Sequence, residues 1–151
     1  MNRIWIYQSK KALTDGTLSE ITRQLNEFIV RWSAHKKKLD ARFEIKYNQF
    51  IILYVNQEEV LASGCSIDES VHFMQEIDKK YDLSLFDRQQ MAFLDPEGEI
   101  RVCHLNDIST LRKSGLLQDD TKVFNNMILD ENQLINSWKI PFRQSGFSAF
   151  A

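Results

Sequence analysis

The apolar pattern between residues 41 and 55 constrains the fold of this 151-residue chain more than any other feature. From 41 to 47, apolar residues alternate with Arg, Glu and Lys, which is typical of a strand with one face in water. The next run, Phe50–Val55, is unbroken and rich in β-branched residues, so it indicates a central strand covered on both faces. We expect residues 56–59 to turn the chain into a short third strand, Val60–Ala62, which would complete a meander.

Two other segments have the start signal of an amphipathic helix. Thr17–Glu20 and Ser66–Glu69 are capping boxes, in which a hydroxyl and a carboxylate each accept a hydrogen bond from a backbone N–H, so Thr17 and Ser66 are the predicted N-caps. Apolar residues then recur at helical spacing. They are Leu18, Ile21, Leu25, Phe28, Ile29 and Trp32 in the first helix, and Ile67, Val71, Met74, Ile77 and Tyr81 in the second.

The remaining segments complete an α+β pattern. Residues 3–8 predict a first strand, and residues 91–94 and 100–104 predict a hairpin around a type I turn at Asp95–Gly98. A short helix from Asn106 or Asp107 should end at Gly115, a last helix should run from residue 130 to 138, and residues 123–129 fit strand or loop. We therefore predict a single α+β domain over residues 1–151, with a mostly antiparallel sheet of about five to six strands and three to four helices.

The charge balance argues against a generally basic nucleic-acid-binding surface, because 19 Lys and Arg face 21 Asp and Glu. The densest basic run, Lys36–Lys38, follows the first predicted helix, where cations stabilise the negative end of the helix dipole. No apolar run approaches the roughly 18 residues of a membrane span, and the N-terminus lacks a signal-peptide pattern. Two cysteines, Cys65 and Cys103, do not make a disulfide framework, so we expect a cytoplasmic location.

Several short stretches resemble a family of uncharacterised bacterial proteins of similar length, which are often labelled "ABC transporter ATPase". The stretches are Trp5–Gln8, Trp32–His35, Gly64–Phe73, Leu85–Arg88 and Val123–Asn126. The resemblance implies no activity and no catalytic residues that could be assigned to positions of this chain. The label also fails a sequence test, because a P-loop needs two glycines five residues apart followed by Lys, and the glycines at 16, 64, 98, 115 and 146 do not have that spacing. ATP hydrolysis is therefore not predicted.

The most informative candidate site is the corner Gly64-Cys65-Ser66-Ile67-Asp68. If Ser66 is the N-cap, Cys65 lies just outside a helix N-terminus, where the helix dipole can lower the pKa of a thiol. The same N–H groups could bind an anion, although Asp68 and Glu69 in the first turn would oppose it. Gly64 would let a ligand or another segment approach the backbone. The alternative is that Cys65 is a small buried apolar residue at a strand-to-helix corner.

The three histidines add no local site. His72 is seven residues from Cys65, a rise of about 10 Å along a helix, and it shares a helix face with Asp68 and Glu76, which suggests a solvated polar face. Only the fold could bring His35 or His104 to Cys65. The cysteines and histidines lack the close spacing of zinc ligands, and we predict neither a metal nor a cofactor.

Polar pairs and the C-terminal tail offer weaker candidates. Asp87-Arg88 and Asn125-Asn126 could orient a polar ligand, but structural ion pairs and turn asparagines explain them equally well. Residues 142–151 carry three phenylalanines, which could pack on their own domain or form a homodimer. We therefore predict a non-catalytic binding or regulatory module for a small ligand or a protein. The alternative is a small enzyme that uses Cys65, Ser66 and Asp68.

Overall fold

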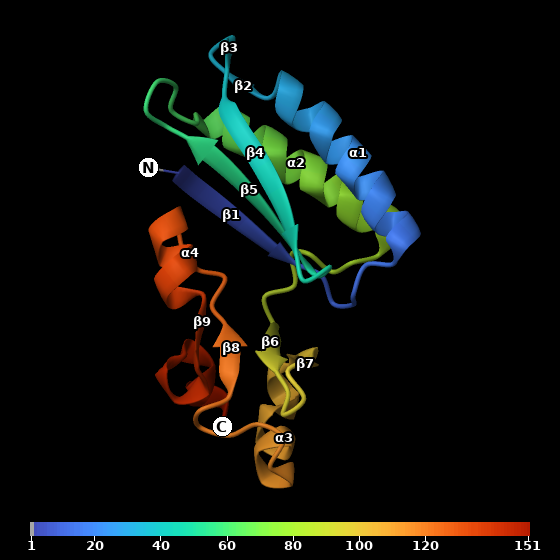
Figure 1. The fold of residues 1–151 in the computed structure, drawn as a ribbon, viewed down its shortest axis with the longest axis vertical. Coiled ribbons are helices and arrows are strands. Elements are labelled where there is room, and N and C mark those ends of the chain that lie inside the picture. The colour runs from blue at the N-terminus through green and yellow to red at the C-terminus, as the bar shows by residue number, and fades with distance from the viewer. Residues whose placement is uncertain (1) are drawn as a thin grey trace. The chain divides into compact units, whose positions relative to one another are not determined.

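The computed structural model describes residues 2–151 and confirms the α+β class (Figure 1). The strands are β1 (Asn2–Gln8), β2 (Ser33–Ala34), β3 (Lys37–Lys38), β4 (Asp40–Lys46), β5 (Phe50–Asn56), β6 (Gln90–Leu94), β7 (Ile100–His104), β8 (Lys122–Phe124) and β9 (Lys139–Pro141). The helices are α1 (Asp15–Arg31), α2 (Gly64–Tyr81), α3 (Ile108–Ser114) and α4 (Glu131–Ser137), with short 3-10 turns η1 (Leu105–Asp107), η2 (Phe142–Gln144) and η3 (Gly146–Phe150). No helix in this described part is long and apolar enough to cross a membrane.

The chain forms two compact units. The first contains the residues up to Phe86 together with Leu129–Glu131, and the second contains Asp87–Ile128 and Asn132–Ala151. The strands are divided among antiparallel sheets of three, two and four strands, so they do not form the one sheet of five to six strands that the sequence suggested. The expectation of one domain for the whole chain stays a prediction.

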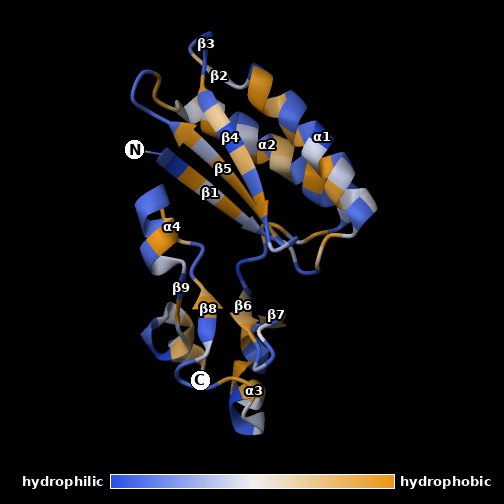
Figure 2. Cartoon of the chain, viewed as in Figure 1, coloured by the Kyte–Doolittle hydropathy of each residue, from blue (hydrophilic) through white to orange (hydrophobic). Residues whose placement is uncertain are grey.

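The first unit is built on a three-stranded sheet in the order β1-β5-β4. All six residues of Phe50–Val55 are buried, so β5 is the central strand that its continuous apolar sequence predicts, and it is coloured as mostly hydrophobic in Figure 2. In β4, Ala41, Phe43 and Ile45 pack against the core, whereas Asp40 and Arg42 are exposed, which confirms the alternation. Residues 60–62 form no strand, because they belong to the connection into α2, where the Ala62 N–H donates to the side chain of Gln57.

Helix α1 begins three residues earlier than the sequence suggested. Thr14 is the N-cap, since its backbone is extended and its hydroxyl accepts a hydrogen bond from the Thr17 N–H at 3.4 Å; the predicted cap at Thr17 is therefore wrong. The expected stripe is confirmed, with Ile21, Leu25 and Phe28 buried. The helix ends where Trp32 becomes extended, and the Leu39 N–H donates to the Trp32 carbonyl to close the β2-β3 hairpin.

The lysine run is consequently not a helix end. His35 and Lys36 have φ values of 51° and 66°, so they occupy the left-handed positions of the tight turn between β2 and β3, and Lys37 and Lys38 form β3. All four of these side chains are exposed. Arg31 is the basic residue in the last turn of α1.

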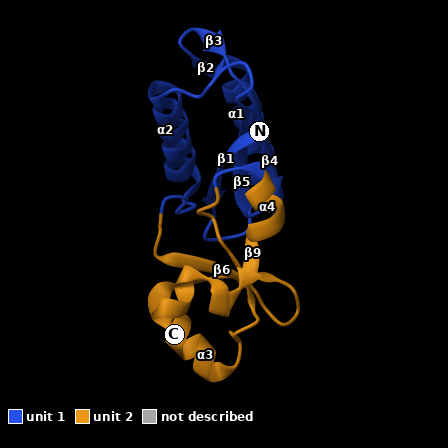
Figure 3. Ribbon diagram, turned by 90° about the vertical axis from the view of Figure 1, so that its left-hand side faces the viewer, with its two compact units in different colours: residues 1–86, 129–131 blue, residues 87–128, 132–151 orange. Residues whose placement is uncertain are grey.

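The second unit, coloured orange in Figure 3, contains a sheet in the order β7-β6-β8-β9. The predicted hairpin is confirmed, with the Gly98 N–H donating to the Asp95 carbonyl, and the helix stop at Gly115 is confirmed by its φ of 81°. Strand β8 includes only residues 123 and 124 of the ambiguous segment 123–129. The last helix ends at Ser137, because Trp138 leaves it to pack against Phe124.

The tail folds onto its own unit over part of its length. Phe142 is buried and Phe147 packs against the same core, which supports the prediction of self-docking, whereas Phe150 is 48% exposed. One core cluster of this unit contains Met91, Phe93, Ile108, Leu117, Val123 and Phe142.

Candidate functional site

The corner at the start of α2 has a different geometry from the one the sequence predicted. Ser63 is the N-cap, and its hydroxyl accepts from the Ser66 N–H at 3.1 Å, while the Ser66 hydroxyl accepts from the Ser63 N–H at 2.7 Å. The predicted cap at Ser66 is therefore wrong, since Ser66 is the buried partner in the capping box. Cys65 consequently lies inside the first turn and is exposed, so it is not the small buried residue of the alternative interpretation.

The packing of α2 against the core explains why the N-cap is Ser63 and not Ser66. Ser66 and Ser70 are fully buried, whereas Ile67 and Val71 are only half-buried, because two large rings occupy the adjacent space. The Trp32 indole N–H donates to the Ser66 carbonyl at 2.8 Å. Tyr7 hydrogen-bonds the Ser70 side chain, and burial raises the pKa of this tyrosine to about 12 although that hydrogen bond lowers it. Helical periodicity alone could not have identified the serines as inward-facing.

The other residues of the corner are open to solvent. Gly64 is exposed and has ordinary backbone angles, and an added Cβ would meet nothing within 4 Å, so nothing here requires a glycine. Asp68 is exposed and lies in the second turn of α2, because the helix already begins at Gly64. The first turn therefore has no acidic residue. Glu69 pairs with Arg31 at 3.2 Å.

The histidines form no catalytic pair with Cys65 among the contacts of residues 2–151. His72 and Glu76 are 3.9 Å apart and 77% and 72% exposed, as expected of a solvated face. The His104 Nδ1 accepts from the Asn106 N–H, so this ring caps η1. Burial and the charge of Asp107 raise the pKa of Cys103 to about 11, so this thiol stays protonated. Within the described residues, no three His, Cys, Asp or Glu side chains are placed to hold a metal ion.

The polar pairs lie in the second unit and take part in turns. The Asp87 carboxylate accepts from the Gln89 N–H, and the Asn125 side chain accepts from the Met127 N–H. The Asn126 side chain accepts from the Trp138 indole N–H at 2.9 Å. Arg88 is exposed, and within residues 2–151 it forms no ion pair with Asp87. The contacts of Asn125 and Asn126 match the structural interpretation of that pair, whereas the ion pair considered for Asp87 and Arg88 is not formed among residues 2–151. Neither pair belongs to the same unit as Cys65.

A shallow cavity of about 510 Å³ lies on the second unit. It is lined by Arg112, Leu117, Gln118, Asp119, Asp120 and Arg143. Two of its charged side chains pair with each other, since Arg112 lies 2.7 Å from Asp119. The backbone N–H of Arg143 donates to the backbone carbonyl of Asp119.

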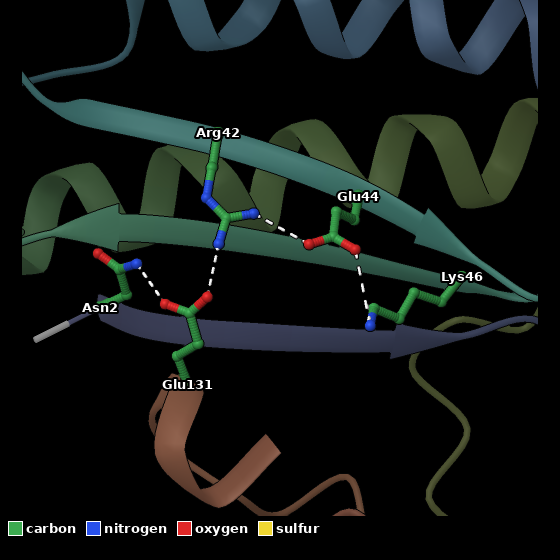
Figure 4. A network of polar contacts seen from close by, with 5 residues as sticks. All are labelled: Asn2, Arg42, Glu44, Lys46 and Glu131. Carbon is green, nitrogen blue, oxygen red and sulfur yellow. Dashed lines mark hydrogen bonds and ion pairs between the residues drawn. The ribbon is translucent and has the colours of Figure 1, made fainter. Parts of the chain in front are cut away.

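A charged network on the first sheet was not predicted from the sequence (Figure 4). Arg42 lies between two carboxylates, 3.0 Å from Glu44 and 2.7 Å from Glu131, and its guanidinium is 3.6 Å from the centroid of the Tyr54 ring. Glu44 also pairs with Lys46 at 3.7 Å, and Asn2 donates to Glu131. The sequence signal was the alternation of Asp40, Arg42, Glu44 and Lys46, which indicates a wet face but not its partners.

The network holds its groups in defined charge states. Burial on its own would raise the pKa of Glu44, but hydrogen bonds from Arg42 and Tyr54 and the nearby positive charges lower it below its ordinary value. Burial and the neighbouring Glu44 raise the pKa of Tyr54, so this phenol stays protonated. The surface of β4 therefore carries fixed charges at neutral pH.

Strand β4 is the last strand of its sheet, so its outer edge has no partner strand within residues 2–151. The Ile4 N–H donates to the Leu129 carbonyl at 3.0 Å, on the side of β1 away from β5. In an antiparallel strand the N–H and C=O groups of successive residues point to opposite sides. Because β1 pairs with β5 and β5 with β4 residue by residue, the direction of the Ile4 groups fixes the direction of the backbone groups in β5 and then in β4. The even-numbered residues of β4 therefore bond to β5. The backbone groups of Ala41, Phe43 and Ile45 point outward.

Comparison with protein families, with curated proteins and with solved structures gives no match for this chain.

Proposed function

We propose that this protein is a non-catalytic binding module that recruits a protein partner by adding a strand to the outer edge of β4. The proposal rests on one observation, the outer edge of β4 that no strand of residues 2–151 covers. It spans seven residues in continuous register with β5, and it contains no proline, glycine or bulge that would prevent a further strand from pairing. Exposed edges of this kind bind extended segments through main-chain hydrogen bonds, and alternate side chains supply the specificity.

The side chains of β4 define the partner strand. Residues directly opposite each other in an antiparallel pair interact, and opposite charges stabilise the pair. A matching strand needs basic residues opposite Asp40 and Glu44 and acidic residues opposite Arg42 and Lys46. Between these charges it needs apolar residues to cover Ala41, Phe43 and Ile45, which are only half-buried.

Photo-crosslinking in the cells that make the protein tests this proposal. A photoreactive side chain at exposed Asp40 is expected to give a protein adduct that the same group at Arg23, exposed on α1, does not give. Ala41→Pro should abolish the adduct, because it removes an outward N–H while leaving the bonds to β5 intact. An adduct that is insensitive to Ala41→Pro contradicts the proposal. Turnover in a broad substrate screen that Cys65→Ala abolishes without unfolding the protein also contradicts it.

A small enzyme that uses the Cys65 corner is the second candidate, and the exposure of this thiol in the first turn of an 18-residue helix favours it. Iodoacetamide labelling between pH 6 and 9 tests it. A thiol that titrates well below the reference pKa of about 8.5 supports an activated nucleophile. A thiol that does not react over this pH range contradicts the enzyme hypothesis. Both cysteines are free, which supports the proposed cytoplasmic location.

A further inference from the structure

The charge pattern of β4 is complementary to itself when the strand is read backwards. From residue 40 to 46 the sequence is Asp-Ala-Arg-Phe-Glu-Ile-Lys, with acid, base, acid and base at the even positions. We infer that the partner strand is β4 of a second copy of this chain, and that two first units pair edge to edge into a continuous six-stranded sheet. This inference rests on the proposed function, because it uses the same edge.

The register of this pairing follows from the charges. A two-fold axis through Phe43 places Asp40 of one copy opposite Lys46 of the other, and Arg42 opposite Glu44. Each pair occurs twice by symmetry, so four opposite-charge pairs form on the face of the sheet that carries the Arg42 network. On the helix face, Phe43 lies opposite Phe43 and Ala41 opposite Ile45, so the half-buried apolar residues of both copies cover one another.

Neighbouring registers are unfavourable. With the axis at Arg42, two arginines face each other and Asp40 faces Glu44. With the axis at Glu44, two glutamates face each other and Arg42 faces Lys46. A shift by a single residue places outward-pointing backbone groups opposite inward-pointing ones, so the main-chain bonds cannot form. Like charges directly opposite destabilise a strand pair, so these two axes are disfavoured. The axis at Phe43 places opposite charges together and pairs all seven residues of β4, because Phe43 is the centre of the strand.

The dimer should be reversible, because one seven-residue edge buries less surface than the roughly 1,600 Å² of a standard interface. We expect a dissociation constant on the order of micromolar to tens of micromolar for the full chain. Sedimentation equilibrium over this concentration range measures it.

Charge reversal at the ends of the strand tests the pairing. Asp40 and Lys46 are suitable because neither contacts Arg42 or Glu131, although Lys46 also pairs with Glu44 of its own strand at 3.7 Å. D40K should weaken dimerisation at least tenfold, since it sets two lysines opposite each other in both symmetric pairs, and K46D should do the same with two aspartates. The double variant D40K/K46D restores opposite charges and should recover dimerisation. A dimer that D40K does not weaken, such as one formed through the C-terminal tail, overturns the inference, as does a double variant no better than the single ones.

Disulfide formation tests the register. On a Cys65→Ser background, D40C protein mixed with K46C protein should give an oxidised heterodimer, because opposite residues in a non-hydrogen-bonded pair have Cα atoms about 4.5 Å apart, within the range for a disulfide. Neither variant alone should link, since two copies of residue 40 lie at opposite ends of the paired strands. Linkage of D40C with E44C in place of K46C would show the axis at Arg42 and overturn the assignment.

The two proposals can fail separately. A protein that stays monomeric at all concentrations, yet gives an adduct with a different protein from position 40 in cells, overturns the second-copy inference and supports the proposed function. A monomer that gives no adduct from position 40 overturns both.

Discussion

The turn at Asp95–Gly98 depends on two residues with separate roles. Gly98 has a φ of 81°, a conformation that costs other residues energy, and Asp95 accepts hydrogen bonds from the Glu97 and Glu99 N–H groups and from Arg101 at 2.8 Å. Asp95 is 7% exposed, so the carboxylate that accepts these hydrogen bonds is nearly buried within the hairpin. The aspartate and the glycine could be predicted from turn preferences, but the bond to Arg101 could not, since it depends on the register of β6 and β7.

Gly98→Ala should therefore lower the free energy of unfolding by about 1–2 kcal/mol, because alanine is strained in the left-handed region. Gly64→Ala is the matched control, and it should cost nothing measurable since its backbone is ordinary and its surroundings are open. Urea denaturation of both variants measures the difference. Equal losses would show that φ at Gly98 does not determine the effect.

Asp95→Asn should reduce stability at neutral pH and change its pH dependence. The hydrogen bond from Arg101 holds the pKa of Asp95 below its usual value, with smaller effects from the Glu99 and Glu97 N–H groups. Its contribution is therefore complete above the unfolded pKa of about 3.9 and is lost as the pH falls through the lower folded pKa. The difference in denaturation midpoint between wild type and Asp95→Asn should shrink below about pH 4. A constant difference from pH 7 to 2 would contradict this.

At the scale of elements, periodicity predicts which segments are helices and strands but places their ends less well. In both α1 and α2 the N-cap lies three residues before the predicted one, at Thr14 and Ser63. Each segment offers two hydroxyl residues three positions apart, and the local sequence does not decide between them. In α2 the choice follows from the fit of Ser66 beneath Trp32.

Ser63→Ala should consequently destabilise the protein by about 1 kcal/mol, the usual cost of losing an N-cap. Cys65→Ala is the control, because this exposed residue lies within the helix and its side chain takes no part in the capping box. Thermal or urea unfolding compares the two. A cost at Cys65 as large as that at Ser63 would contradict the assigned helix start.

At the scale of the whole chain, Arg42 connects parts that are far apart in sequence. Its partner Glu131 is 89 positions away, and the adjoining Leu129 and Asp130 pair with β1, so this late segment is held on the first unit. No local pattern could predict this contact.

A double-mutant cycle with Arg42→Gln and Glu131→Gln measures the connection. The pair is partly exposed, at 47% and 35%, so we expect a coupling of about 0.5–1 kcal/mol. The coupling should fall in 1 M salt, since the Debye length shortens to about 3 Å. Additive effects at low salt would show that the ion pair does not stabilise the segment.

Several elements could be predicted because their signal is local. They are the alternation in β4, the continuous apolar run of β5, the stripe of α1, the hairpin around Gly98 and the stop at Gly115. These features depend on residues two to four positions apart, which a single segment contains. The folded chain was needed to show that β4 lies at the edge of the sheet, that Ser66 and Ser70 face the core and that Glu131 reaches Arg42. Strand order, the fit of side chains and long-range ion pairs depend on segments tens of residues apart, and local periodicity carries no information about them.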